Sequence, residues 1–207
     1  CPTAAAVETL EREGRRAPGA RVELVGDVML DASLLFRSRA KKPLAVLPTN
    51  GYVLATVHRA ENTDDPAALA AIAEALSRIH REVLPVVMPV HPRTAQALET
   101  HGVALDALRL PPVGYLEMTW LLQHAAVVAT DSGGVQKEAY FFGKPCVTLR
   151  TTTEWTELID LGANVLAGTA VGAIQEAVLQ ALHTSVPTDL AVYGGGVAAE
   201  RIASSLS

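Results

Sequence analysis

The sequence is poor in cysteine, in aromatic residues and in long apolar runs, and each shortage excludes a class of protein. Its two cysteines, Cys1 and Cys146, lie far apart and lack partners at zinc-binding spacing, so we expect a reduced chain without a metal site. No stretch approaches the length of a membrane span, and no basic start followed by an apolar core indicates secretion. The sequence therefore predicts a soluble, cytoplasmic protein with no membrane partner.

Basic residues are fewer than acidic ones: the chain has 17 lysines and arginines and 22 aspartates and glutamates, which gives a net charge of -5. Aromatic residues make up 4% of the chain, and no basic stripe with interleaved aromatics is present, so we expect no nucleic-acid partner. Hydrophobic residues occupy 49% of the 207 positions, which is typical of a globular protein of one large domain or two small ones.

Strand-like and helix-like segments alternate along the chain. Strands are expected at residues 21–25, 53–57, 85–90, 107–110, 125–129, 146–149 and 164–166. Helices are expected at residues 3–13, 67–80, 115–123, 134–142, 154–161, 171–182 and 197–206, with Asp65 and Pro66 opening the second of them. This alternation predicts an α/β fold of the Rossmann-like, doubly wound class, with a parallel sheet covered by helices on both faces.

The segment at residues 131–139 carries the most informative motif. It follows a predicted strand and opens a helix with Ser132, Gly133 and Gly134. Backbone N–H groups at the start of a helix are unpaired and lie at the positive end of its dipole, so they bind anions such as phosphate. Glu138 shares a helix face with Gly134 and can accept hydrogen bonds from a sugar diol. The motif indicates a nucleotide or nucleotide-sugar site, although a plain strand-to-helix turn with a solvated Glu138 fits the same residues.

Polar side chains follow four of the predicted strands at the point where each strand ends. In chain order they are His58, Arg59, Glu61 and Asn62; His91 and Arg93; Asp131 and Ser132; and Arg150 with residues 151–154. The carboxyl ends of parallel strands meet at one edge of the sheet, where ligands of α/β proteins bind. The gathered histidines and arginines predict a local positive field suited to a diphosphate. Taken singly, either histidine is better explained as a hydrogen-bonded core residue, and it is the coincidence of four such loops that favours a binding site.

Four motifs occur in a distinctive order and spacing. They are Val57-His58-Arg59-Ala60-Glu61-Asn62, Pro89-Val90-His91-Pro92, Asp131-Ser132-Gly133-Gly134-Val135-Gln136-Lys137-Glu138 and Leu149-Arg150-Thr151-Thr152-Thr153-Glu154-Trp155. In sequence, order and spacing they resemble the non-hydrolysing UDP-N-acetylglucosamine 2-epimerases, and the similarity runs from Cys1 to Ile202. The resemblance implies a GT-B enzyme, with two Rossmann-like domains and an active site in the cleft between them.

The resemblance also implies a reaction. The family interconverts UDP-N-acetylglucosamine and UDP-N-acetylmannosamine by inversion at C2, through elimination of UDP to a 2-acetamidoglucal and its re-addition. No nicotinamide, metal or other cofactor is required.

Position by position, the resemblance assigns roles to residues of this chain. Ser132, Gly133 and Gly134 correspond to residues that hold the UDP phosphates, with help from Arg150, and Glu138 to the residue that binds the ribose hydroxyls. His58 corresponds to a residue beside the phosphate or the reacting sugar and is the candidate catalytic residue. Arg59 and His91 match a place where some bacterial members bind a second, activating UDP-sugar.

The resemblance covers only the second domain of the family and the helices that cross between its halves. We expect an interdomain helix at residues 1–20, a UDP-binding domain at 21–190 and a C-terminal crossing helix at 191–207. The catalytic N-terminal domain, with the acid and base carboxylates, is expected to lie outside this chain, so the chain alone should bind UDP and turn over poorly or not at all. The full-length enzyme is expected to be a homodimer that serves polysaccharide synthesis.

Some positions depart from the family pattern. Ala60 stands where many members carry a second arginine, which weakens the assignment of an activating site. Lys137 stands where many members carry an acidic residue, and it places one more positive charge near the phosphate cradle. Trp155 is best explained at this point as a packed aromatic residue.

Two functions from other classes stay open. One is a glycosyltransferase of similar architecture, which would bind the same donor and need an acceptor. The other is a non-catalytic module that binds a nucleotide-sugar.

Overall fold

The computed structural model describes residues 1–14, 21–187 and 189–207. They form two compact units, one made of Cys1–Arg39 with Thr188–Ser207 and the other of Ala40–Pro187. The expected division into residues 1–20, 21–190 and 191–207 stays a prediction, and positions 15–20 of its first segment lie outside the described residues.

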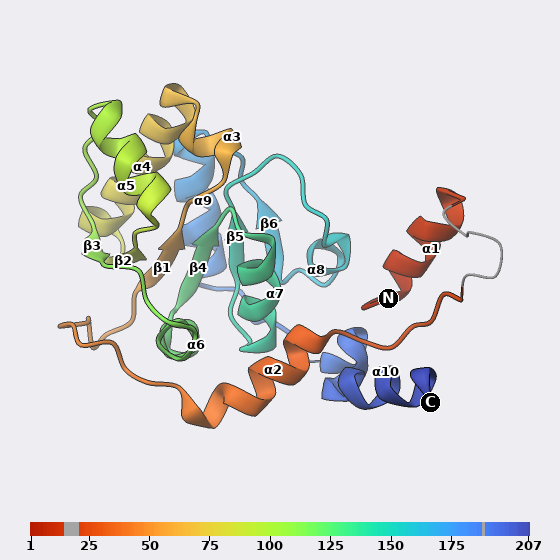
Figure 1. The fold of residues 1–207 in the computed structure, drawn as a ribbon. Coiled ribbons are helices and arrows are strands. Elements are labelled where there is room, and N and C mark those ends of the chain that lie inside the picture. Colours follow the sequence, from red (N-terminus) through yellow and green to blue (C-terminus); the bar gives the residue numbers. More distant parts are fainter. Residues whose placement is uncertain (15–20, 188) are drawn as a thin grey trace. The chain divides into compact units, whose positions relative to one another are not determined.

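The larger unit holds a six-stranded, wholly parallel sheet with the order β3-β2-β1-β4-β5-β6 (Figure 1). The strands are β1 (Val53–Thr56), β2 (Val86–Pro89), β3 (Leu108–Leu110), β4 (Val127–Thr130), β5 (Cys146–Thr148) and β6 (Asn164–Leu166). The order reverses between β1 and β4, which is the switch point of a doubly wound sheet, and the predicted fold class is confirmed.

Helices cover both faces of this sheet. They are α3 (Ala60–Thr63), α4 (Pro66–Glu82), α5 (Pro92–Thr100), α6 (Tyr115–His124), α7 (Gly133–Phe141), α8 (Thr156–Asp160) and α9 (Val171–Ala181). In β1, Val53 and Ala55 pack with α4 and α9, whereas Leu54 packs on the opposite face with α6 and α7. Both faces of β1 are therefore buried, as its unbroken apolar run predicts.

Helix α4 illustrates how the sequence sets an element's start. The Asp65 carboxylate accepts hydrogen bonds from the N–H groups of Ala67, at 2.9 Å, and Ala68, at 3.3 Å, and Pro66 occupies the first helical turn. The prediction of a helix opened by this pair is confirmed.

The smaller unit contains α1 (Ala4–Arg12), α2 (Val28–Phe36) and α10 (Ala198–Leu206), with the 3-10 helices η1 (Arg37–Arg39) and η2 (Leu190–Gly196). The Asp31 carboxylate of α2 accepts hydrogen bonds from the N–H groups of Ala198 and Ala199, which caps α10. At Gly194 the backbone has a φ of 85°, and a Cβ there would lie 2.6 Å from the Cα of Gly26. Only glycine fits this close approach.

The strand expected at residues 21–25 is wrong. Residues 21–27 form neither helix nor strand, and the N–H of Val25 donates to the carbonyl of Cys1 instead of joining the sheet. Helices α2, α3 and α5 were not predicted either. The starts of α2 and α5 are set by the side-chain caps Asp27 and His91, which the hydrophobic pattern does not reveal, whereas α3 begins without a side-chain cap.

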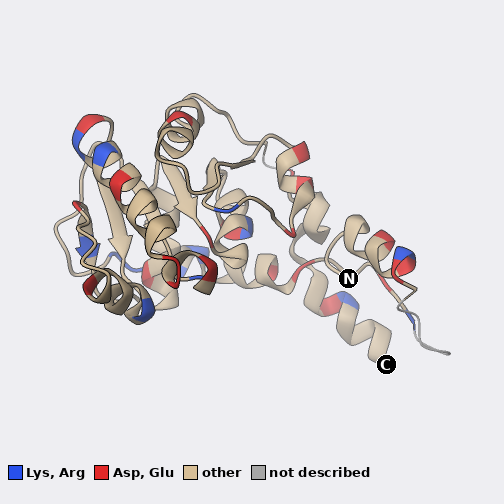
Figure 2. Cartoon of the chain, turned by 90° about the horizontal axis from the view of Figure 1, so that it is seen from above, with Lys and Arg blue, Asp and Glu red and all other residues tan. Residues whose placement is uncertain are grey.

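Charged residues of both signs lie interspersed over the sheet-containing unit, not gathered in one stripe (Figure 2). Across residues 1–14, 21–187 and 189–207, no helix is long and apolar enough to cross a membrane. In the same described residues no group of three or more His, Cys, Asp or Glu side chains is placed to hold a metal ion. Burial raises the pKa of the Cys146 thiol to about 12, so Cys146 is no thiolate nucleophile.

Candidate functional site

The start of α7 presents a half-open cradle of amides at the carboxyl end of β4. The N–H of Ser132 donates to the Oγ1 of Thr130 at 2.9 Å, and the Ser132 Oγ accepts from the N–H of Val135 at 3.4 Å. Within the described part of the chain, no acceptor pairs with the amides of Gly133 and Gly134. These two N–H groups, with the hydroxyl proton of Ser132, therefore remain for an anion at the positive end of the helix dipole.

Asp131 organises the loop that follows β1. Its fully buried carboxylate accepts hydrogen bonds from the backbone N–H groups of His58, at 3.0 Å, and Arg59, at 2.9 Å, and from the side-chain amide of Asn62, at 3.0 Å. Asn62 also donates to the carbonyl of Leu149 at 3.1 Å. One carboxylate thus fixes the loops after β1 and β4 to each other, and Asn62 ties them to the residue that follows β5.

His58 and Asp131 form a hydrogen-bonded pair. The Nδ1 of His58 lies 3.2 Å from the Oδ1 of Asp131. This hydrogen bond is the main reason that the pKa of His58 lies above its ordinary value, and burial opposes it. Burial by itself would raise the pKa of Asp131, but the hydrogen bonds from His58, Arg59 and Asn62 outweigh it and leave that pKa below the ordinary value. A carboxylate-bound imidazole with its other nitrogen turned outward suits a proton donor or a phosphate ligand.

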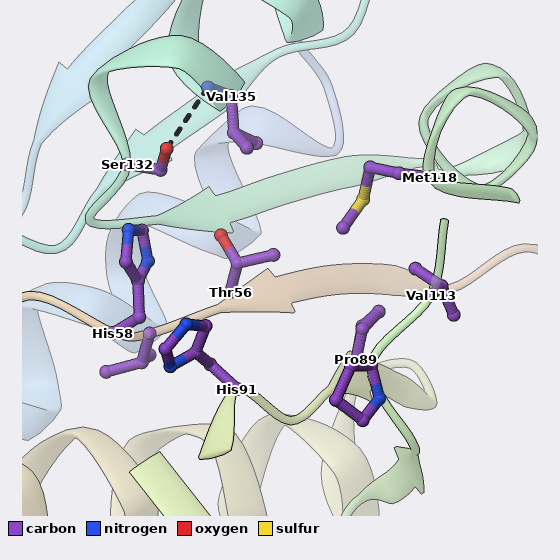
Figure 3. A pocket seen from close by; sticks show the side chains of 10 residues that line it. Thr56, His58, Pro89, His91, Val113, Met118, Ser132 and Val135 are labelled. Atoms are coloured by element: carbon purple, nitrogen blue, oxygen red, sulfur yellow. Dashed lines mark hydrogen bonds between the residues drawn. The ribbon is translucent and has the colours of Figure 1, made fainter. Parts of the chain in front are cut away.

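His91 caps helix α5 and lies beside His58. Its Nδ1 accepts a hydrogen bond from the N–H of Arg93 at 3.2 Å, and its ring centroid is 5.6 Å from that of His58. Figure 3 shows both rings on the wall of one pocket, with Ser132 and Thr56 close by. Both histidines therefore lie at the predicted edge of the sheet, and neither is a core residue: the His58 side chain is 39% exposed, and His91 is exposed as well.

The pocket has a volume of about 280 Å³. It is lined by Thr56, Val57, His58, Pro89, His91, Pro112, Val113, Met118, Ser132 and Val135. Polar groups gather at the end formed by the two histidines and Ser132, and apolar side chains line the end formed by Val113 and Met118 (Figure 3). A polar end joined to an apolar end is a common design for sites that bind small organic anions.

Two of the predicted arginines, Arg59 and Arg150, are paired with carboxylates. The guanidinium of Arg150 binds both oxygens of Glu154, at 2.9 and 3.0 Å, and its Nε lies 3.0 Å from Glu61. The hydrogen bond from Arg150 holds the pKa of Glu154 at about 2. Arg59 lies 3.6 Å from Glu154 and 3.8 Å from Glu61. The positive field expected from the sequence is therefore partly neutralised by two acidic residues whose pairing the sequence pattern did not reveal.

Glu138 lies one turn into α7, and its residue is 7% exposed. Burial raises the pKa of its carboxyl, and a hydrogen bond from the Tyr115 side chain and the charge of Lys137 act in the opposite direction. The carboxylate is held in place by Tyr115 at the start of α6, a contact that no motif indicated.

The predicted residues at the ends of β1, β2, β4 and β5 do converge at one edge of the sheet. Sequence reasoning missed Asp131 as the organising carboxylate, Thr130 as the acceptor for the Ser132 amide, and Met118 in the pocket wall. A signal was available for the first, because a buried acidic residue directly after a parallel strand must accept hydrogen bonds from neighbouring loops.

Comparison with known proteins adds an independent line of evidence. The family model described as UDP-N-acetylglucosamine 2-epimerase matches residues 1–207. A UDP-2,3-diacetamido-2,3-dideoxy-D-glucuronate 2-epimerase of Pseudomonas aeruginosa is 51% identical over 207 residues, covering 100% of this chain and 58% of the relative. A UDP-N-acetylglucosamine 2-epimerase homolog of Methanococcus maripaludis is 43% identical over 179 residues, covering 81% of this chain and 48% of the relative.

Among solved structures, the Methanocaldococcus jannaschii UDP-GlcNAc 2-epimerase in complex with UDP-GlcNAc and UDP has a TM-score of 0.83 and 30% identity. That match covers 100% of this chain and 59% of the solved chain. The chain thus spans about half to three fifths of the length of the proteins that it matches.

Proposed function

Because the chain belongs to the UDP-N-acetylglucosamine 2-epimerase family, we propose that its sheet-containing unit is the UDP-binding part of an enzyme that inverts C2 of a UDP-activated 2-acetamido sugar. The observation that carries the proposal is the pair of open amides at Gly133 and Gly134, at the switch point of the sheet. Diphosphates bind at such helix starts because several N–H groups and the helix dipole act on the same charge.

The three parts of the nucleotide are assigned to neighbouring groups of the site. The diphosphate lies on the amides of Gly133 and Gly134 with the Ser132 hydroxyl, and the ribose hydroxyls bind Glu138. The uracil ring enters the apolar end between Val113 and Met118.

His58 assists the departure of UDP. In this reaction the C2 proton is removed as the C1–O bond to UDP breaks, and charge grows on the leaving diphosphate oxygen. The pKa of His58, raised by Asp131, favours the imidazolium, which donates to that oxygen. Arg150 adds a second positive group next to the cradle, and its release from Glu154 is part of binding. The base that removes the C2 proton is proposed to come from outside this chain, on the family's first domain.

Calorimetric titration of the chain with UDP and with uridine tests the binding role. We expect Gly133→Val to abolish or strongly weaken UDP binding because the new side chain fills the cradle, and to change uridine binding little. Gly172→Val is the matched control: Gly172 occupies the first turn of α9, with no atom within 4 Å of its added Cβ. Equal losses of UDP and uridine affinity in Gly133→Val would show general damage and would contradict the proposal.

The reaction itself is tested with the full-length protein in D2O. Incorporation of deuterium at C2 of UDP-N-acetylglucosamine without any acceptor supports epimerisation. Release of UDP that depends on an added acceptor would instead support a glycosyltransferase, and binding without either reaction would support a non-catalytic module.

A second substrate is favoured by one specific observation, the 51% identity with a relative named for UDP-2,3-diacetamido-2,3-dideoxy-D-glucuronate. Both candidate sugars carry the same UDP group and a 2-acetamido group, so the site described above serves either. The ratio of the two kcat/KM values, measured in the same deuterium assay, identifies the substrate, and a higher value for UDP-N-acetylglucosamine would exclude the acidic sugar as the preferred one.

A further inference from the structure

The indole of Trp155 lies against the phosphate cradle. Its Nε1 is 3.2 Å from the point where a Cβ on Gly133 would stand. The Nε1 atom is buried, and among the residues that the structure describes none accepts a hydrogen bond from it. An indole nitrogen can donate a hydrogen bond but cannot accept one, so this N–H needs an acceptor.

Two contacts hold the indole in this position. The ammonium of Lys137 lies 4.1 Å from the centroid of the Trp155 ring, and Lys137 is 5% exposed. This distance is well inside the range of a cation–π interaction, which is strong for tryptophan. The backbone N–H of Trp155 donates to the Oγ1 of Thr153 at 3.1 Å, and Thr153 in turn donates to the Oε1 of Gln136 at 2.6 Å. Lys137 and Gln136 both belong to α7.

The ammonium of Lys137 lies over the indole, so the positive charge that the sequence predicts near the cradle is held on the ring that borders Gly133. An acidic residue, which many family members carry at this position, would be repelled by the negative face of the ring. Lys137 and Trp155 thus form a cation–π pair, and the indole of this pair lies next to Gly133.

The packed-aromatic explanation leaves the indole N–H unexplained. A buried donor without a partner is unfavourable, and a phenylalanine would place an aromatic ring there without that cost. Glu154 does not satisfy the donor: its Oε2 is 3.6 Å from the same Cβ point of Gly133, and both of its oxygens are bound by Arg150.

We propose that Trp155 is a ligand-binding residue whose indole N–H donates to a phosphate oxygen of the diphosphate held at Gly133 and Gly134. The proposal rests on the proposed function, since it adds a side-chain donor to the same cradle. Lys137 is a positioning residue that fixes the plane of the indole, and the absence of a side chain at Gly133 leaves the room in which donor and phosphate meet.

Substitution of the two tryptophans of the chain tests the proposal. Trp155→Phe keeps an aromatic ring and removes the N–H, so the Kd for UDP should rise about tenfold while the Kd for uridine stays the same. Trp120→Phe is the matched control, because Trp120 is a partly buried residue of α6 that packs against the core and stacks on His124. Its Kd for UDP should equal that of the unchanged chain.

The Trp120→Phe chain also gives a readout that does not depend on the folding of Trp155→Phe. Trp155 is then its single tryptophan, and UDP should change its emission while uridine should not. If the unchanged chain fails to bind UDP, the proposed function falls. If it binds UDP and Trp155→Phe binds with the same Kd, or the Trp155 emission does not respond to UDP, the role of Trp155 is overturned and the proposed function stands.

Discussion

Replacing Asp131 by asparagine tests whether one buried carboxylate organises the ligand-binding edge. Asp131 is 0% exposed and accepts hydrogen bonds from the N–H groups of His58 and Arg59 and from the amide of Asn62. Asparagine keeps the size, but it is neutral and one of its two polar atoms donates. With its oxygen in the place of Oδ2, all three bonds lose their charged acceptor, and its NH2 replaces the Oδ1 that faces the Nδ1 of His58. A hydrogen bond to a charged group contributes about 1.5–3 kcal/mol, and a buried donor left unpaired costs about 1–3 kcal/mol.

We therefore expect Asp131→Asn to lower the free energy of unfolding by about 2–4 kcal/mol, measured by urea unfolding followed by circular dichroism. Asp106→Asn is the matched control. Asp106 pairs with Arg81 at 3.2 Å, and its side chain is 55% exposed. The loss of this ion pair in Asp106→Asn should change the free energy of unfolding by less than about 0.5 kcal/mol. Equal losses of stability in the two variants would refute the reasoning, because Asp131 would then support the fold no more than a surface carboxylate does.

Three further predictions concern His58, Glu138 and Gly194. An NMR titration should give His58 a pKa above 6.5, and this pKa should fall in Asp131→Asn. Because the pKa is raised in the folded state, the stabilisation from His58 is complete below pH 6.5 and is lost as the pH rises through the folded pKa. An unchanged His58 pKa in the variant would reject the His58–Asp131 pair. Glu138→Ala should weaken UDP binding by about 1–3 kcal/mol, and calorimetry showing equal affinity would exclude its ribose role. Gly194→Ala should destabilise the chain more than Gly195→Ala. The backbone φ is positive at both positions, but an added Cβ at Gly195 meets no atom within 4 Å. Equal urea midpoints of the two variants would count against the close approach of Gly194 to Gly26.

The sheet from β1 onward could be predicted from the sequence because its strands are short, mostly apolar runs, and polar residues follow four of them. The run at 53–57 is buried on both faces and therefore shows no alternation, which is typical of a central parallel strand. The segment at 21–25 has a similar local pattern, but its backbone pairs with Cys1, and no local pattern specifies a partner that distant.

The candidate site was predictable in position and less so in its pairings. Topology brings the ends of parallel strands together, so the convergence of His58, His91 and Ser132 follows from the order of strands and helices. The partners of charged side chains depend on how loops pack. Nothing in the spacing showed that Glu61 would reach Arg150, or that the ammonium of Lys137 would lie over the ring of Trp155.

A crystal structure of the chain with UDP tests the central claim most directly. The account predicts that oxygens of the diphosphate accept hydrogen bonds from the amides of Gly133 and Gly134 at about 2.7–3.1 Å. A diphosphate bound away from the start of α7, with those two amides left to solvent, would contradict it.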